Sequence, residues 1–430
     1  MISDKLTRRT FLTSATLLAG GAAFPAPAFL HAQNINSKLN VGCIGISGQG
    51  GYSVGNVRGE NIVALCDVDQ RHLNNGVATF PQAECFVDFR KMFDKFDGKL
   101  DAVTIATPDH IHAAASINAM KRGINCYTEK PLAHDLGETR KMIEVAKDKK
   151  VKTQMGIQMH AQQNYHRVVE LIQAGAIGKV KEVHVWVDKA WGNRPIPKGT
   201  FEVPKTLDWD VWLGPAAFRP YNPCYVPGGW RSYWAFGTGT LGDMACHYLD
   251  LPFWALGLRE PTTIEASGPP VNPECCSIGL TVKYQFPKTD KHEALMLTWY
   301  DHNVRPPVIK EQGLPNWSAG VIFVGSDGLL LADYGKHILY PETKFQDYKR
   351  PDKSIPPSPG HHAEWLNAIK NNGTTSCNFD YSGKITETIL LGVIAYRTGK
   401  KLTWNPVALK TDVAEANALL TTIPRKGWEF

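Results

Sequence analysis

The stretch LNVGCIGISGQGG, residues 39–51, decides the fold. An apolar run leads directly into a glycine-rich loop. A loop with so little side-chain bulk lets backbone N–H groups approach a pyrophosphate at the N-terminus of the following helix. In the pattern G-x-G-x-x-G, Gly45 and Gly50 take the outer positions, while Ser47 replaces the central glycine and Gly48 stands beside it. The loop alone is weak evidence, because a plain turn has a similar composition.

An acidic residue at the end of the next apolar run strengthens this interpretation. Asp67 follows the run NIVALC, residues 61–66. A carboxylate at that place accepts hydrogen bonds from the adenosine ribose hydroxyls and repels a 2′-phosphate, so we expect NAD rather than NADP. The alternative is that Asp67 only caps a helix.

The pattern around the loop predicts a Rossmann domain over residues 38–158. Near-continuous apolar runs alternate with amphipathic helical segments, which is typical of a doubly wound parallel sheet with helices on both faces. The strand-like runs are residues 39–46, 61–69, 100–107, 123–129 and 151–158.

A second domain of α+β class is predicted over residues 159–430. Its strands alternate with a period near two, and a tight GSDG turn joins two of them, which indicates a mostly antiparallel sheet with one covered face. The segment 191–234 is too long for a plain connector and is expected to build a pocket wall. An open sheet face with apolar and aromatic positions favours a homo-oligomer, either a dimer or a tetramer.

The first residues read as a targeting segment. TRRTFLTS is followed by the modest apolar run ATLLAGGAAF and by the small-residue sequences APA and LHA. We therefore expect a twin-arginine signal peptide at residues 1–32 and export to the periplasm. A membrane helix is disfavoured because the run is short and two prolines interrupt it, and no later segment is long and apolar enough to span a bilayer.

Charge and cysteine content narrow the partners further. The formal charge of +6 is interspersed, with no basic stripe, so nucleic acid is not an expected partner. Nine cysteines occur without a CxxC pair. Cys43, Cys66 and Cys126 lie in apolar runs and are expected to be buried thiols, whereas a disulfide involving Cys275 or Cys276 stays open. No zinc-type histidine spacing is present, so no metal is expected.

Several further motifs together carry a family resemblance. They are TPDHIH (107–112), EKP (129–131) and GDMACHYLD (242–250), in addition to the glycine loop. Their order resembles that of the glucose–fructose oxidoreductase/inositol dehydrogenase (Gfo/Idh/MocA) family, in particular its signal-bearing branch. The resemblance extends through HHAEWLNAIK and LLGVIAYRTGKKLTW, and Ser47 is its departure from the family's glycine loop.

The resemblance implies roles in the first domain. Lys130 becomes a catalytic or substrate-positioning lysine beside a nicotinamide, whose cationic ring would lower its pKa. Glu129 supports the cofactor side, and Pro131 fixes the turn, with the preceding peptide a candidate for the cis form. The strand-end motif predicts further cofactor contacts because ligands bind at the carboxyl edge of such a sheet. These contacts are Thr107, Pro108, His112 and, following the fifth strand, Gln158.

In the second domain, Asp243 and His247 are four residues apart and share one face of a helix. The spacing alone allows a metal pair, a core hydrogen bond or an acid–base couple. With the resemblance, His247 becomes the general base and Asp243 orients substrate and imidazole and favours the protonated ring. Trp230, Arg231 and Tyr233 are expected either to stack on a sugar or to pack against a neighbouring subunit.

The expected function is therefore an NAD-dependent oxidoreductase acting on a hydroxyl of a sugar, polyol or glycoside. The partner is a small carbohydrate, and no stable membrane insertion is expected after signal removal. Because free NAD is scarce outside the cytoplasm, we expect a cofactor loaded before export and recycled in place. The alternatives are a glycosidase that works by transient ring oxidation, and a non-catalytic sugar-binding relative.

Overall fold

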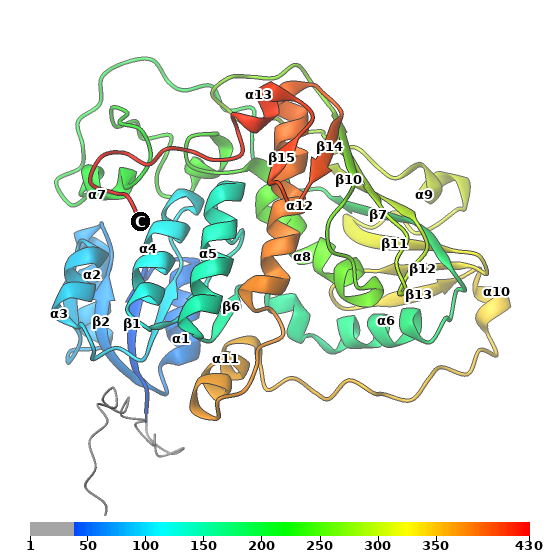
Figure 1. Cartoon of the computed structure of the whole chain (residues 1–430), viewed down its shortest axis with the longest axis horizontal. Coiled ribbons are helices and arrows are strands. Elements are labelled where there is room, and N and C mark those ends of the chain that lie inside the picture. The colour runs from blue at the N-terminus through cyan, green and yellow to red at the C-terminus, as the bar shows by residue number, and fades with distance from the viewer. Residues whose placement is uncertain (1–37) are drawn as a thin grey trace, which may run out of the picture. The chain divides into compact units, whose positions relative to one another are not determined.

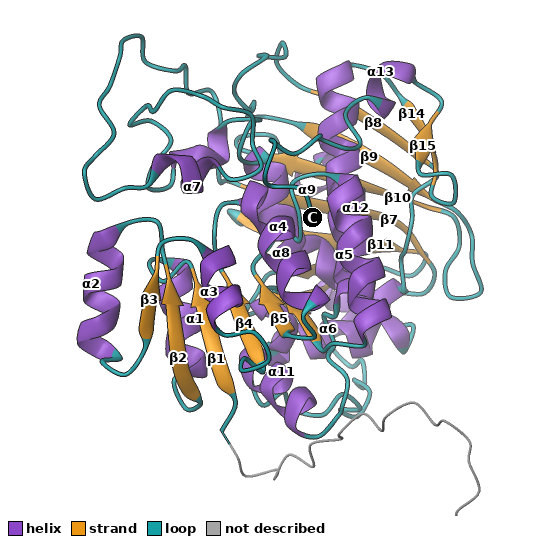
Figure 2. Ribbon diagram, turned by 60° about the vertical axis from the view of Figure 1, so that its left-hand side comes forward, coloured by secondary structure: helices purple, strands orange, loops and turns teal. Residues whose placement is uncertain are grey.

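The computed structural model describes residues 38–430, so the predicted signal peptide at residues 1–32 lies outside the described residues. The first sheet has six parallel strands in the order β3-β2-β1-β4-β5-β6, which is the strand order of a dinucleotide-binding fold. Figure 2 shows most of these strands side by side. The strands are β1 Asn40–Ile44, β2 Asn61–Cys66, β3 Glu84–Phe86, β4 Ala102–Ile105, β5 Asn125–Thr128 and β6 Thr153–Met155. The predicted Rossmann architecture is confirmed, although the short strand β3 was missed.

Helices connect these strands as crossovers. They are α1 Gln49–Val57, α2 Gln70–Thr79, α3 Phe89–Lys95, α4 Asp109–Lys121 and α5 Leu136–Lys149. Local sequence explains their starts. The backbone N–H of Glu138 donates to Asp135 at 2.8 Å while Glu138 accepts from the Asp135 N–H, a capping box that begins α5. Asp69, not Asp67, caps α2, because its side chain accepts from the Arg71 N–H.

The second sheet has nine strands in the order β13-β12-β11-β7-β10-β9-β8-β14-β15. All pairings are antiparallel except that of β10 with β7, so the predicted mostly antiparallel sheet is confirmed. Its strands are β7 Val180–Val187, β8 Thr263–Ser267, β9 Thr281–Phe286, β10 Leu295–Asp301, β11 Ala319–Gly325, β12 Leu329–Ala332, β13 His337–Tyr340, β14 Leu402–Asn405 and β15 Lys410–Thr411.

The helices of this half are α6 Gln163–Gln173, α7 Trp209–Leu213, α8 Gly239–Leu256, α9 Pro307–Glu311, α10 Glu342–Phe345, α11 His361–Lys370, α12 Phe379–Thr398 and α13 Ala414–Asn417. Short 3-10 turns are η1 Gln158–Ala161 and η2 Gly229–Ser232. In Figure 1, α12 stands beside α5 and between the two halves, and it also packs on α8. The chain returns to the first sheet at α11, where Trp365 and Leu366 join the core beside β1 and β2.

Alternation along β7 places side chains on both faces of the second sheet. Val183 and Val185 belong to the main core, whereas Trp186 faces the other side with Ile322 and Leu331. The segment that contains α9 covers that second cluster, and Trp186 is fully buried. The apolar outer face was expected to be open, but the chain covers this part of it with its own residues.

Two further sequence expectations can be compared with residues 38–430. All nine cysteines are free, and Cys43, Cys66 and Cys126 are buried as predicted, so neither Cys275 nor Cys276 forms a disulfide. No helix in this part of the chain combines the length and apolar character needed to cross a bilayer.

Candidate functional site

The glycine loop at the end of β1 is tightly packed on one side and open on the other. A Cβ on Gly45 would lie 2.4 Å from the Ala106 carbonyl oxygen, and one on Gly50 would lie 2.0 Å from the Gly45 oxygen. Gly48 has φ +54, a region that disfavours other residues, and a Cβ there would meet nothing within 4 Å. No side chain caps α1, and although the Gly50 N–H donates to the Ser47 oxygen at 2.9 Å, the start of the helix suits an anion such as a pyrophosphate.

Asp67 ends β2 and supports this loop. One carboxylate oxygen accepts from the Ile46 N–H at 3.1 Å, and the other accepts from the Asp69 N–H at 3.0 Å. That second oxygen also lies 3.1 Å from Nδ1 of His72, whose pKa it raises. A carboxylate has about four acceptor positions, so Asp67 retains capacity for a ribose hydroxyl.

His112 holds two loops together. Its ring nitrogens lie 2.8 Å from the Pro131 carbonyl oxygen and 2.9 Å from that of Thr107, and burial lowers its pKa to about 4. The residue is 1% exposed and does not line the cavity described below. His112 was predicted as a cofactor contact. In the structure its buried ring instead contacts the backbone oxygen of Thr107, the residue before the N-cap of α4.

Glu129 is a buried carboxylate with one oxygen in use and one without a partner. Its Oε1 accepts from Gln49 at 3.1 Å, Ser53 at 3.3 Å and Gln158 at 3.0 Å. No described residue donates a hydrogen bond to Oε2, and burial raises the pKa of the group. Oε2 packs against Gly156, where a Cβ would lie 2.4 Å from it, while Gln49 and Gln158, which donate to Oε1, line the cavity described below. The cofactor side predicted for Glu129 and Gln158 fits this arrangement.

Lys130 and Asp243 form a buried ion pair between the two halves. The Lys130 Nζ donates to Oδ1 of Asp243 at 2.7 Å, and the Lys130–Pro131 peptide is cis. Burial by itself would lower the pKa of Lys130, but Asp243 outweighs burial and the pKa is raised. We expected a lowered pKa for Lys130. The protein raises it instead, because the carboxylate of Asp243 accepts a hydrogen bond from the amine.

Asp243 accepts from two further groups. Arg231 Nε donates to the same oxygen at 3.1 Å, and Trp191 Nε1 donates to the other at 2.8 Å. Burial would raise the pKa of Asp243, but Lys130 and Arg231 hold it well below its usual range. The carboxylate is thus ionised and held in place by three donors.

His247 follows Asp243 by one turn of α8 but is not bonded to it. The buried Nδ1 of His247 has no hydrogen-bond partner among the described residues, and burial and nearby Lys130 lower its pKa to about 3. Asp243 was predicted to orient this imidazole and to favour its protonated form. Its oxygens accept from Lys130, Arg231 and Trp191 and not from the ring. Its charge does favour the protonated ring, but burial and Lys130 outweigh this effect.

Lys130, Asp243 and His247 line one cavity of about 740 Å³. The segment 191–234 contributes much of the wall, as predicted, and the first domain contributes Gln49, Lys130 and Gln158. The lining residues are Gln49, Lys130, Gln158, Ala190, Trp191, Arg194, Pro223, Cys224, Val226, Pro227, Gly228, Gly229, Arg231, Ser232, Asp243 and His247. The predicted catalytic trio Lys130, Asp243 and His247 is therefore brought together.

Two predicted sugar-contacting aromatics lie elsewhere. Trp230 and Tyr233 are 5% and 1% exposed and pack inside an aromatic cluster with Phe236. They neither line the cavity nor face a neighbouring subunit, because their own chain surrounds them. Trp191 and Arg194 line it instead. Nothing in the sequence distinguished these two residues from the rest of their segment.

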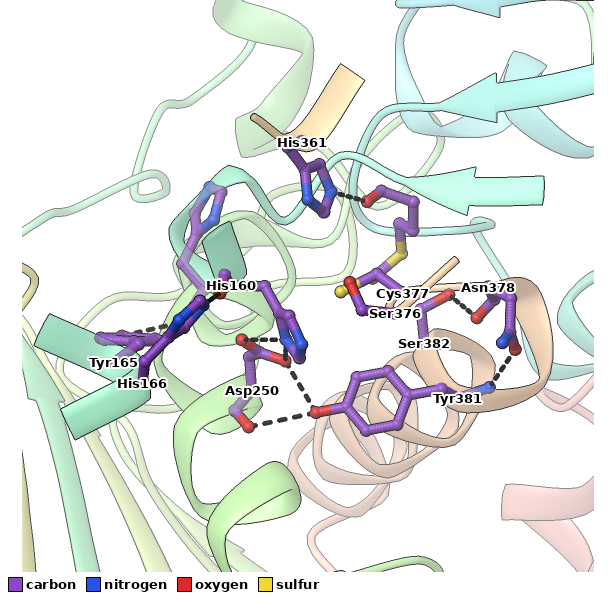
Figure 3. Close-up of polar contacts among 12 residues, drawn as sticks. His160, Tyr165, His166, Asp250, His361, Ser376, Cys377, Asn378, Tyr381 and Ser382 are labelled. Atoms are coloured by element: carbon purple, nitrogen blue, oxygen red, sulfur yellow. Dashed lines mark hydrogen bonds and ion pairs between the residues drawn. The ribbon is translucent and has the colours of Figure 1, made fainter. Parts of the chain in front are cut away.

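A second polar group includes Asp250, which also lies on α8, together with residues from two other segments (Figure 3). Ligand atoms of His160, Asp250 and Cys377 lie within 4.8 Å of one another and could hold a metal ion. His160 Nδ1 lies 2.9 Å and 3.0 Å from the Asp250 oxygens, and the Tyr381 hydroxyl donates to Asp250 at 2.7 Å. Hydrogen bonds within the protein thus satisfy the carboxylate. Histidine spacing in the sequence could not reveal this group because its members come from three distant segments.

The match to protein families covers both halves. Residues 39–157 match a model described as an oxidoreductase family, NAD-binding Rossmann fold, and residues 169–297 match one described as an oxidoreductase family, C-terminal alpha/beta domain. The first domain is therefore the family's NAD-binding domain.

Curated relatives match over part of the chain. A levoglucosan dehydrogenase of Pseudarthrobacter phenanthrenivorans is 28% identical over 171 residues, covering 40% of this chain and 36% of the relative. An inositol 2-dehydrogenase of Rubrobacter xylanophilus is 32% identical over 149 residues, covering 33% and 42%. A glycosyl hydrolase family 109 protein of Shewanella pealeana is 26% identical over 209 residues, covering 41% and 44%. The chain thus aligns with less than half the length of these relatives.

Solved structures extend the likeness in fold. The WlbA dehydrogenase from Bordetella pertussis, in complex with NADH and UDP-GlcNAcA, superposes with a TM-score of 0.60 at 18% identity. The superposition covers 86% of this chain and 99% of that one. At this identity the likeness concerns the fold alone.

Proposed function

The chain belongs to the Gfo/Idh/MocA oxidoreductase family, and on that premise we propose that it is an NAD-dependent oxidoreductase acting on a CH–OH group of a sugar, polyol or glycoside. One observation carries the proposal: Lys130, Asp243 and His247 meet in a single cavity beside the NAD-binding domain. The first two form an ion pair there, and the imidazole stands free of it.

The cofactor would be held by groups already described. The open side of Gly48 and the uncapped start of α1 suit the pyrophosphate, and Asp67 suits the ribose. Glu129 supports this side of the cavity by accepting from Gln49 and Gln158, which line it. NAD, when bound, supplies the hydride acceptor. The negative charge of Asp67 supports NAD over NADP.

The side chains then manage the proton. Oxidising a secondary alcohol removes one hydride and one proton from the same CH–OH group. Lys130, kept protonated by Asp243, donates a hydrogen bond to the substrate oxygen and stabilises negative charge that develops there. His247, which is neutral near pH 7 and whose Nδ1 has no partner among the described residues, is the group that accepts the proton. Asp243 positions the lysine rather than the imidazole.

A screen of sugars tests this function. Oxidised and reduced sugars are added to the protein as isolated, and the absorbance of its nicotinamide is followed. We expect reduction of the cofactor by at least one sugar alcohol group and reoxidation by a carbonyl sugar. No absorbance change with any sugar, with NAD present, would contradict the function.

We also propose that the cofactor stays bound and is recycled in place in a periplasmic protein. The twin-arginine pattern in residues 1–32 supports it, because that route exports folded proteins that often carry a cofactor. Protein released from the periplasm should carry about one nucleotide per chain by mass spectrometry and absorbance. Protein that is purified without nucleotide and becomes fully active only when NAD is added would contradict tight binding of the cofactor. It would not contradict the oxidoreductase function.

A glycosidase is the second candidate, favoured by the alignment with the glycosyl hydrolase family 109 protein. Ring oxidation would acidify a neighbouring C–H bond, elimination would expel the leaving group, water would add, and the hydride removed first would be returned. The reaction therefore needs no net oxidant. Release of phenol from aryl glycosides without added NAD would favour this candidate over a net oxidoreductase.

A non-catalytic sugar-binding protein is the third candidate. The intact set of Lys130, Asp243 and His247 argues against it. Sugar binding by calorimetry without turnover, in the presence of NAD, would favour it. A dimer or tetramer stays part of the proposal, and light scattering after size exclusion tests it.

A further inference from the structure

Two arginines face the cavity with hydrogen-bond donors that the described protein does not use. We propose that the substrate is a sugar that carries a carboxylate, and that Arg194 and Arg231 bind this carboxylate. The proposal rests on the proposed function, since it names the substrate class of the same site.

Arg231 is fixed at one edge and free at the other. Its Nε donates to Asp243 at 3.1 Å, and its guanidinium lies over the Trp230 ring, 4.2 Å from the centroid. These contacts fix the plane of the group. No described residue accepts a hydrogen bond from Nη1 or Nη2, and 30% of the side chain is exposed. The two terminal nitrogens therefore present a fork to the cavity.

Arg194 lines the same cavity. None of residues 38–430 forms an ion pair or accepts a hydrogen bond from its guanidinium. A Cβ on Gly229 would lie 3.4 Å from its Nη1, so the glycine leaves the space in which the guanidinium lies. A cationic group with no acidic neighbour at a cavity wall suits an acidic ligand.

The charge count of the wall points the same way. Its charged side chains are the cations Lys130, Arg194 and Arg231 and the single anion Asp243, which leaves a net charge of two positive with His247 neutral. Asp243 is already bonded to Lys130 and Arg231. The buried carboxyl groups of Glu129 and Asp109, which do not line the cavity, also act on Lys130 and Arg231. The excess positive charge on the cavity wall itself favours an anionic ligand over a neutral sugar.

The phosphates of the cofactor do not account for these arginines. Phosphates have their own place at the glycine loop and the start of α1, in the first domain. Arg194 and Arg231 belong instead to the segment 191–234 of the second domain, and Arg231 bonds to Asp243, not to the glycine loop. A carboxylate matches the planar fork of Arg231 with two parallel hydrogen bonds.

Matched sugars test the proposal. Initial rates with NAD are compared for glucose, glucuronate and glucose 6-phosphate, and for the galactose counterparts. We expect kcat/KM for the uronic acids to exceed that of the neutral sugars by about 10- to 100-fold, the effect of charge-assisted hydrogen bonds. A preference for the phosphates over the uronic acids would overturn the carboxylate, and equal rates for all three kinds would overturn the anion site while the proposed oxidoreductase stands.

Variants locate the effect. Arg194→Gln should reduce the ratio of uronic acid to neutral sugar kcat/KM about tenfold, and Arg194→Lys should give an intermediate value because charge remains without the fork. Arg259→Gln, which removes an exposed arginine paired with Asp380, is the matched control and should leave the ratio unchanged. If Arg194→Gln weakens NADH binding instead and leaves the ratio as it is, the arginine serves the cofactor and the proposal is wrong.

A binding measurement keeps the test independent of turnover. Glucuronate and glucose are titrated into the NAD-loaded protein by calorimetry, for wild type and Arg194→Gln. Tighter glucuronate binding that is lost in the variant supports the proposal even if neither compound is oxidised. Equal binding of the two compounds to wild type overturns it, and failure of every sugar to react overturns only the proposed function.

Discussion

Helix α8 carries two aspartates, Asp243 and Asp250, whose surroundings differ in one decisive respect. Both are buried and both accept several hydrogen bonds. Around Asp243, however, His247 Nδ1 and, nearby in the first domain, Glu129 Oε2 have no partner. Around Asp250, His160 and Tyr381 complete a closed set of bonds within the protein.

The comparison separates a group built for a ligand from a group built for stability. A buried polar atom without a partner costs free energy, so an unpartnered nitrogen on a residue that lines a cavity, as in His247, is a place where a bound molecule can supply the partner. A fully bonded group instead ties segments together, here η1, α8 and the start of α12 (Figure 3). Changes at Asp250 should therefore alter stability, and changes near Asp243 should alter turnover.

The largest effect is expected for Asp250→Ala. The change leaves the His160 ring and the Tyr381 hydroxyl without their buried acceptor, which should lower the free energy of unfolding by about 3 to 5 kcal/mol. Chemical denaturation measures it. The control Asp380→Ala removes an exposed partner of Arg259 and should cost less than about 1 kcal/mol. An unchanged unfolding midpoint for Asp250→Ala would show that Asp250 does not stabilise the fold. If the variant is as stable as wild type and loses only turnover, Asp250 belongs to the functional site instead.

Lys130→Met comes next. It removes the donor to the substrate oxygen, so kcat should fall at least about a hundredfold while the cofactor stays bound. Steady-state rates and the nucleotide content of the purified variant measure both effects. Lys141→Met, on the exposed side of α5, is the control and should be active. Unchanged turnover in Lys130→Met would remove the lysine from the mechanism.

Asp67→Asn tests the carboxylate that we place beside the ribose of the cofactor. Loss of the negative charge should raise the kcat/KM ratio of NADP to NAD about tenfold, because the 2′-phosphate is no longer repelled. Asp69→Asn removes an equal charge two residues away, at the cap of α2, and should leave cofactor preference unchanged. Equal shifts in both variants would mean that overall charge, not Asp67, selects the cofactor.

The smallest effect concerns pH and His361, a buried histidine that begins α11. Burial lowers the pKa of His361 to about 4, from about 6.5 when unfolded, and its Nε2 lies 2.7 Å from the Met155 oxygen. Between these pKa values the unfolded chain binds the additional proton, so acid destabilises the fold. From about pH 6 to about pH 5, wild type should lose about 1 kcal/mol more than His361→Gln. Parallel stability curves, measured by denaturant titration, would show that His361 does not titrate as described.

Much of the first domain could be predicted because its signals are local. Apolar runs of strand length, helical segments between them and a glycine loop are read within short windows, and strand order follows from the fold they specify. The short edge strand β3 was missed because three residues carry little pattern. The grouping of Lys130 with Asp243 and His247 was also anticipated, but through family resemblance and not through spacing.

The contacts inside the site were harder to foresee. Spacing on a helix suggested a bond between Asp243 and His247, yet competition for the same carboxylate settled the pairing in favour of Lys130, Arg231 and Trp191. Aromatic composition suggested Trp230 and Tyr233 as sugar contacts, yet both are buried, and Trp191 takes a place at the cavity. Composition cannot tell which side of a long loop faces the core.

The sequence by itself determined the alternation of strands and helices, the glycine turn and the acid that follows it, since each depends on neighbours a few residues away. Only the tertiary structure decided the protonation of Lys130, the isolation of His247 and the union of His160, Asp250 and Cys377. Electrostatic pairing and burial depend on distances between side chains that lie far apart along the chain. Folding sets these distances, and no local pattern records them.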